Sequence, residues 1–150
     1  MIVNKRLRVS TAKPNGNRPC YVLDTSALLA LAGDEPGAKT VASLLTKGRR
    51  GQVRLYLSFI SVMEAGYKAY QVQGEDGLAN MLAYLQHLPL VRIDVNDELI
   101  ALAARMKGTY RMSVTDAWVL ATAKQLGATL VHKDPEFEPA RAEARLQCLS

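Results

Sequence analysis

The sequence contains few of the residues that define several common kinds of site. Only two cysteines occur, Cys20 and Cys148, and only two histidines, His87 and His132. The cysteine count is too low for a disulfide framework and the spacing rules out a cysteine-based zinc site, although a single disulfide stays open. No hydrophobic run approaches the roughly 18 residues of a membrane span. The basic N-terminus lacks the hydrophobic region of a secretory signal. We therefore expect a cytoplasmic protein without a membrane segment.

Glycine-rich phosphate-binding loops are also missing. No Gly-x-Gly-x-x-Gly segment is present, so a dinucleotide site lacks support. Residues 33–40, GDEPGAKT, resemble a P-loop only superficially, because Ala38 separates the glycine from the lysine and the preceding gap is too short. Two acids within this segment would also repel phosphate. The sequence therefore gives no support to a nucleotide-binding protein of either kind.

The positive charge of the chain is concentrated at one end. Lysine and arginine number 19 against 14 aspartates and glutamates, a formal net charge of +5. The whole excess lies in residues 1–19, which contain no acid and whose basic residues are Lys5, Arg6, Arg8, Lys13 and Arg18. Prolines and glycine in this stretch are typical of a flexible arm. Such an arm can collect RNA through its phosphates, but a solvated tail is the commoner situation and is the interpretation we favour.

Residues 20–150 are expected to form one α/β domain, a length sufficient for a proper core. Strands are predicted at 21–23, 53–57, 90–93 and 129–131, with a fifth at 145–149, and helices at about 26–32, 35–47, 61–71, 75–87, 97–107 and 114–127. Strands separated by helices pair in parallel through right-handed crossovers. The sequence therefore predicts a three-layer α/β/α sandwich with a short parallel sheet of four to five strands.

Four acids occupy positions that the predicted fold would bring together. Asp24 directly follows the first predicted strand, and Asp134 comes just after the fourth. Glu64 and Asp116 lie in the early turns of helices that start from the same edge of the sheet. Because ligand sites in such folds gather at the carboxyl ends of the strands, we expect one cluster of carboxylates there.

Clustered carboxylates indicate a bound cation, because like charges otherwise raise one another's pKa and resist burial. Oxygen ligands without cysteine or clustered histidine favour Mg²⁺ or Mn²⁺ over zinc. Such ions can activate water, polarise a phosphate and stabilise a leaving oxygen. Each acid alone also has an ordinary interpretation: Asp24 and Asp116 as helix caps, Glu64 as a half-exposed helix residue, Asp134 as a turn residue before proline. Their order and placement carry the prediction.

Four segments carry a resemblance to a known family. They are residues 22–28 (VLDTSAL), 61–64 (SVME), 113–117 (SVTDA) and 134–137 (DPEF). In this order they resemble the PIN-domain ribonucleases, and among these the small VapC-type toxins of bacterial toxin–antitoxin pairs. The resemblance extends over residues 21–150, so it covers nearly the whole chain apart from the basic arm.

The resemblance implies a PIN-like fold and a Mg²⁺- or Mn²⁺-dependent endoribonuclease. Asp24, Glu64 and Asp116 would be catalytic metal ligands, Asp134 a supporting or second-metal acid, and Ser26 a small polar residue that orients a ligand or water. His132 departs from the family, which often has a small polar residue there; it either contacts phosphate or closes the strand, and we favour the second. The resemblance also implies an RNA substrate, a homodimer and an antitoxin partner that occupies the active-site groove.

A second function class stays open at this stage. A PIN-like domain could bind RNA or serve as a scaffold without catalysis. The complete set of acids favours the nuclease, because a module without catalysis has no reason to retain carboxylates that repel one another.

Overall fold

The computed structural model of the chain describes residues 8–10 and 17–150. The strands are β1 (Arg8–Ser10), β2 (Cys20–Leu23), β3 (Arg54–Ser58), β4 (Val91–Ile93), β5 (Thr129–His132) and β6 (Leu146–Cys148). The α-helices are α1 (Thr25–Ala32), α2 (Ala38–Arg49), α3 (Phe59–His87), α4 (Asp97–Thr109) and α5 (Val114–Leu126), and a 3₁₀ helix, η1, spans Pro135–Ala140.

The strands form one parallel sheet in the order β1-β4-β3-β2-β5-β6. From β2 the chain adds β3 and β4 on one side. After β4 it crosses back over β2 and adds β5 and β6 on the other side. β2 therefore lies in the middle, with β3 on one side and β5 on the other. The carboxyl ends of these three central strands lead into α1, α3 and η1.

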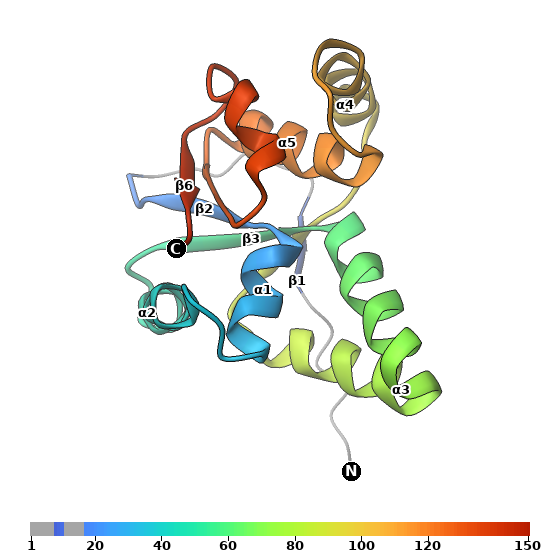
Figure 1. The fold of residues 1–150 in the computed structure, drawn as a ribbon. Helices are drawn as coiled ribbons and strands as arrows, with labels where there is room; N and C mark the ends of the chain where they lie inside the picture. Colours follow the sequence, from blue (N-terminus) through green and yellow to red (C-terminus); the bar gives the residue numbers. More distant parts are fainter. Residues whose placement is uncertain (1–7, 11–16) are drawn as a thin grey trace.

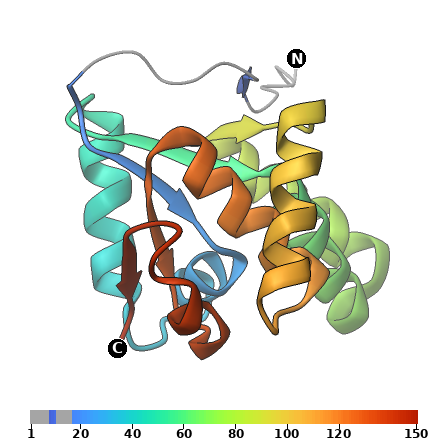
Figure 2. The ribbon, with the colours of Figure 1, turned by 90° about the horizontal axis from the view of Figure 1, so that it is seen from above.

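Helices cover both faces of the sheet, which confirms the predicted three-layer sandwich. Figure 1 shows α4 and α5 on one side of the strands and α1, α2 and α3 on the other. Alternate residues of each strand serve the two cores: Val22 and Leu130 pack towards α4 and α5, whereas Leu23 and Val131 pack towards α1 and α2. Figure 2 shows the same arrangement from above, with α4 and α5 in front of the strands. Both faces are buried, as parallel sheets require.

Local signals in the sequence account for most helix boundaries. The side chains of Ser58, Asn96 and Ser113 accept hydrogen bonds from backbone amides in the first turns of α3, α4 and α5, which satisfies donors that a helix leaves free. Gly127 ends α5 with φ of 61°, a conformation that glycine adopts without strain. α3 contains a kink at Gln73 and Gly74, so it corresponds to the two helices predicted on either side of Gly74.

The two ends of α2 and the number of strands differ from the prediction. α2 starts at Ala38 rather than at residue 35, because the turn before it includes Gly37 with φ of 96°. The helix also continues past Gly48 to Arg49. A sixth strand, β1, pairs with β4 at the edge of the sheet, although the sequence predicted four to five strands and a flexible arm in that region. Of the arm residues with predicted RNA contacts, Lys5, Arg6 and Lys13 lie outside the described residues.

Cys20 and Cys148 are both free thiols, and β5 lies between their strands, so they do not form the single disulfide that the sequence left open. None of the helices within the described ranges has both the length and the hydrophobicity of a membrane crossing.

Candidate active site

Asp24 lies at the centre of the candidate site, at the junction of β2 and α1. Its carboxylate caps α1 by accepting a hydrogen bond from the Ser26 amide at 3.1 Å, and the Ser26 hydroxyl donates to the same oxygen, Oδ2. The other oxygen, Oδ1, is buried and has no hydrogen-bond partner among the described residues. Burial raises the pKa of Asp24; the Ser26 hydrogen bonds oppose this increase, and the charge of Glu64 adds to it.

Ser26 links Asp24 to the next central strand. Its Oγ accepts a hydrogen bond from the backbone amide of Lys133 at 3.0 Å, immediately after β5. The Asp24 amide in turn donates to the Val131 carbonyl at 3.0 Å. The predicted supporting residue therefore fixes one carboxylate oxygen of Asp24 and also holds the start of the segment that carries Asp134.

Asp116 comes from the first turn of α5 and is also buried, with 6% of its surface exposed. The pKa of Asp116 is raised to about 8, first by burial, then by the charge of Asp24 and by contacts with Glu136 and Asp134. A carboxyl group with this pKa is mostly protonated at neutral pH unless a cation is bound nearby. The backbone amide of Asp116 donates a hydrogen bond to the Ser113 hydroxyl at 3.1 Å, which fixes the residue in the first turn of the helix.

The segment after β5 completes the cluster. Asp134 caps η1 by accepting a hydrogen bond from the Glu136 amide at 2.9 Å. Asp116, Asp134 and Glu136 each offer a carboxylate oxygen, and these oxygens lie within 4.8 Å of one another. Glu136 was not among the predicted site residues. Its position two residues after Asp134 is the one sequence feature that could have indicated it. The sequence does not show the tight turn of η1, which brings Glu136 close to Asp116.

Glu64 lies in α3, beside Asp24 but outside the group of three oxygens. Its side chain is 17% exposed and forms a loose ion pair with Lys68, at 3.9 Å between Nζ and Oε1. Figure 1 shows α1 and α3 starting close together at the ends of β2 and β3. The four predicted acids therefore come together at one edge of the sheet, linked by the charge effects of Glu64 on Asp24 and of Asp24 on Asp116.

The chemistry of this cluster fits a divalent cation. Within the part of the chain that the structure describes, no lysine or arginine forms an ion pair with Asp24, Asp116, Asp134 or Glu136. Lys133, the nearest basic residue in sequence, is paired with Glu35 instead, at 3.1 Å. Asp24 and Asp116 are buried without a basic partner, which is costly, and the unpartnered Oδ1 of Asp24 is a free ligand atom. Oxygen donors alone favour Mg²⁺ or Mn²⁺.

Two other predictions concern His132 and the basic arm. His132 is the last residue of β5 and is fully buried, which agrees with its interpretation as a residue that closes the strand. Of the basic arm residues, Arg18 donates a hydrogen bond to the Gly51 carbonyl at 3.0 Å. Gly51 follows α2 and precedes β3. It therefore lies at the amino ends of the strands, whereas the acids lie at the carboxyl ends.

Comparisons with known proteins define the family. The sequence model of the PIN domain matches residues 21–142, so the chain belongs to the PIN-domain family. No curated protein sequence matches it significantly.

Solved structures of toxin–antitoxin systems share the fold. A chain of VapBC2 from Rickettsia felis, bound to a promoter DNA fragment, aligns with a TM-score of 0.69 and 16% identity over 87% of this chain and 99% of that one. A chain of VapBC-1 from nontypeable Haemophilus influenzae gives 0.68 and 20% identity over 86% and 97%. VapC20 from Mycobacterium tuberculosis, described as a toxin that cleaves the sarcin–ricin loop, gives 0.63 and 17% identity over 80% and 94%. At these identities the likeness concerns the fold.

Proposed function

We propose that this chain is a metal-dependent endoribonuclease that acts as the toxin of a toxin–antitoxin pair. The observation that carries the proposal is the buried carboxylate cluster, in which the pKa of Asp116 is raised to about 8 and Asp24 keeps one oxygen without a partner. Two acids buried in this way destabilise a protein that does not use them. Membership of the PIN family and the cleaving toxin among the structural neighbours support RNA as the substrate.

The residues have distinct roles in this proposal. Asp24, Glu64 and Asp116 would hold Mg²⁺ or Mn²⁺, with Asp134 and Glu136 on the side of the cluster towards η1. When bound, the ion would polarise the scissile phosphate and stabilise the leaving oxygen. Ser26 would keep Asp24 in place, since its hydroxyl holds Oδ2 and leaves Oδ1 free for the ion. In the cell we place the protein in the cytoplasm, where its RNA substrate occurs, and we propose that it forms a homodimer.

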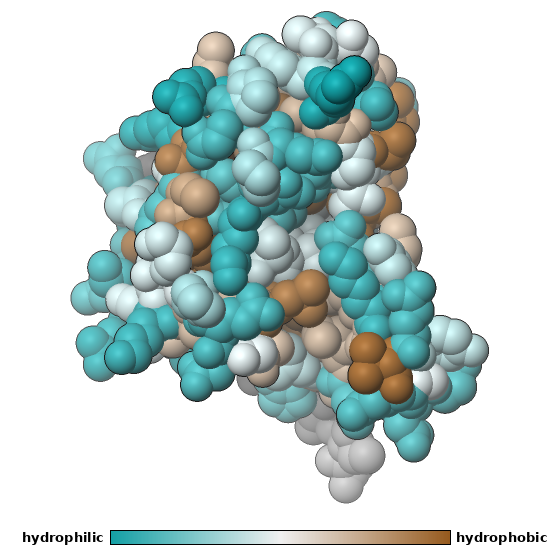
Figure 3. Space-filling view, viewed as in Figure 1, coloured by the Kyte–Doolittle hydropathy of each residue, from teal (hydrophilic) through white to brown (hydrophobic). Residues whose placement is uncertain are grey.

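An antitoxin would bind to the apolar groove along α3. This groove has a volume of about 620 Å³, and its lining residues are Phe59, Val62, Met63, Gly66, Tyr67, Tyr70, Leu78, Leu82, Arg92 and Asp94. Met63, Tyr67 and Tyr70 are each more than two-fifths exposed, which is unusual for large apolar side chains on one helix. Figure 3 shows hydrophobic atoms at the surface over the region of α3, within a mostly hydrophilic face. Met63 in the groove precedes Glu64 in α3, and we propose that the bound segment extends from the groove to the site.

The test is cleavage of a mixed RNA pool by antitoxin-free protein, with Mg²⁺, with Mn²⁺ or with EDTA. Asp24→Asn and Asp116→Asn are expected to abolish cleavage while the fold stays intact, because each removes one charge from a repelling cluster. Binding of RNA without cleavage under any metal would contradict the nuclease and favour a binding module.

A further inference from the structure

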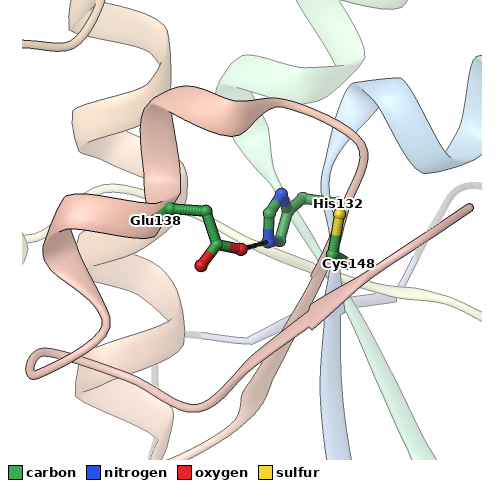
Figure 4. A group of neighbouring side chains, drawn as sticks. All are labelled: His132, Glu138 and Cys148. Carbon is green, nitrogen blue, oxygen red and sulfur yellow. Dashed lines mark ion pairs between the residues drawn. The ribbon is translucent and has the colours of Figure 1, made fainter.

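A second cluster of metal-ligating side chains is formed by residues of β5, η1 and β6. His132 ends β5, Glu138 lies in η1 and Cys148 ends β6. Each offers one ligand atom, and the three atoms lie within 4.8 Å of one another. Figure 4 shows the three side chains gathered in one place, with the Glu138 carboxylate directed at the imidazole. These residues are separate from the five acids of the candidate active site.

The environment of the His132 side chain indicates a bound ligand. Its side chain is fully buried, and neither ring nitrogen has a hydrogen-bond partner among the described residues. Oε1 of Glu138 lies 3.7 Å from Nε2, which is too far for a hydrogen bond. Buried imidazoles are normally hydrogen-bonded or bound to metal. The imidazole packs against the ring of Phe137 in a T-shaped arrangement, with ring centroids 5.1 Å apart.

The one ligand pair with a defined separation, His132 and Glu138, is close to the spacing that a tetrahedral metal ion requires. Zinc binds sulfur at about 2.3 Å and nitrogen or oxygen at about 2.0–2.2 Å, so ligand atoms of one ion lie roughly 3.3–3.6 Å apart. The His132–Glu138 distance of 3.7 Å needs only a small rotamer adjustment. Arg141 holds the other oxygen of Glu138 at 2.6 Å, which keeps Oε1 directed towards His132.

We propose that His132, Glu138 and Cys148 form a zinc site, with the fourth position open to water. Imidazole, thiolate and carboxylate together are the donors of zinc, whereas Mg²⁺ and Mn²⁺ avoid thiolate. Spacing along the sequence excluded a site based on the cysteines; the parallel pairing of β5 with β6 instead places Cys148 opposite His132. The ion would join β6 to η1 and so fix the segment that carries Asp134 and Glu136.

The experiment uses Co²⁺ as a spectroscopic substitute for Zn²⁺ in the full-length, metal-free protein. A thiolate ligand to Co²⁺ gives a near-ultraviolet charge-transfer band that carboxylate sites do not give. We expect this band at one equivalent of Co²⁺ and its loss on addition of Zn²⁺. Cys148→Ser should abolish the band and weaken Zn²⁺ affinity by more than about 100-fold, since loss of an outer partner alone costs 10–100-fold. Cys148 is exposed, so this variant should fold.

Two control variants separate this site from the others. Cys20→Ser removes the other thiol, and Asp24→Asn alters the carboxylate cluster; both should retain the band and the Zn²⁺ affinity. Absence of the band in the unmodified protein, its persistence in Cys148→Ser or its dependence on Cys20 would each overturn the proposal. Because the readout does not involve RNA cleavage, its failure is distinguishable from failure of the proposed nuclease function.

Discussion

At the scale of single residues, the candidate site depends on how Asp24 is held. One oxygen accepts both hydrogen bonds from Ser26, and the other has none. A carboxylate fixed by one oxygen and free at the other is prepared for a cation, because no rotation is needed when the ion binds. The Ser26 hydroxyl also accepts from the Lys133 amide, so one side chain organises two parts of the site.

Ser26→Ala should therefore weaken the site without unfolding the protein. We expect divalent-ion affinity to fall by about 10–100-fold, as for other residues that orient metal ligands. Stability should fall by about 1 kcal/mol, because the Lys133 amide loses its acceptor. Isothermal titration with Mn²⁺ and urea denaturation measure the two effects. Ser26→Thr keeps a hydroxyl and should restore most of the affinity; equal affinities in all three proteins would contradict this role.

Asp116 gives a prediction about pH. The pKa of its carboxyl is about 8 in the folded, metal-free protein and close to 3.8 when unfolded. Between these values the folded state binds the additional proton, so this group makes the protein less stable as pH rises from about 4 to about 8. Asp116→Asn should flatten that part of the stability curve, measured by urea denaturation without metal. Parallel curves for the two proteins would show that Asp116 is not perturbed in this way.

At the scale of elements, α3 serves two purposes. Its first turns carry Glu64 to the site, and its exposed apolar side chains line the groove. Its C-terminal part, after the kink at Gly74, returns so that Leu78 and Leu82 form the other wall of the groove. Gly66 permits this return, because a Cβ there would lie 3.0 Å from Leu78.

Tyr70 tests the groove as the antitoxin site. Tyr70→Ala should weaken the complex with the antitoxin by about 10-fold or more, since buried tyrosines are frequent energetic centres of interfaces. Ile100→Ala on α4 is a matched control, because both side chains are 48% exposed and only Tyr70 lines the groove. Affinities can be measured by calorimetry with the purified partner. An equal loss of affinity in both variants, or no loss in Tyr70→Ala, would show that the antitoxin binds outside this groove.

The sequence predicted the central elements well and the peripheral ones less well. β2, β3 and β5 follow from hydrophobic runs that both cores require, and α4 and α5 from the caps Asn96 and Ser113. β1 was not predicted because three residues within a basic arm carry no periodicity, and only pairing with β4 defines the strand. For the same reason Glu136 was missed: its place in the site comes from the turn of η1.

At the scale of the whole molecule, charge is divided between two regions. The acids gather at the carboxyl ends of the central strands. Arg18, from the basic arm, donates a hydrogen bond to the Gly51 carbonyl before β3, at the amino ends of the strands. Five positive charges in residues 1–19 account for the entire net charge of +5. Arg18 therefore lies away from the acids, and residues 8–10 belong to the sheet as β1. For the remaining arm residues we keep the prediction of a solvated tail.

The salt dependence of RNA binding tests that interpretation. A triple variant, Lys5→Gln with Arg6→Gln and Lys13→Gln, should bind RNA in EDTA with the same salt dependence as the unmodified chain. Each lost phosphate contact would reduce the slope of log affinity against log salt by about 0.7 for a single strand. A slope reduced by about 2 would show that the arm collects RNA through its phosphates.

The central claim is that the buried carboxylates form the metal site of a ribonuclease. The most direct measurement is cleavage of a mixed RNA pool by the antitoxin-free protein and by Asp24→Asn, each with Mg²⁺, Mn²⁺ or EDTA. We predict cleavage that requires the metal and that the variant loses by at least about 100-fold, while circular dichroism shows both proteins folded. Full activity of Asp24→Asn, or cleavage that continues in EDTA, would contradict the account.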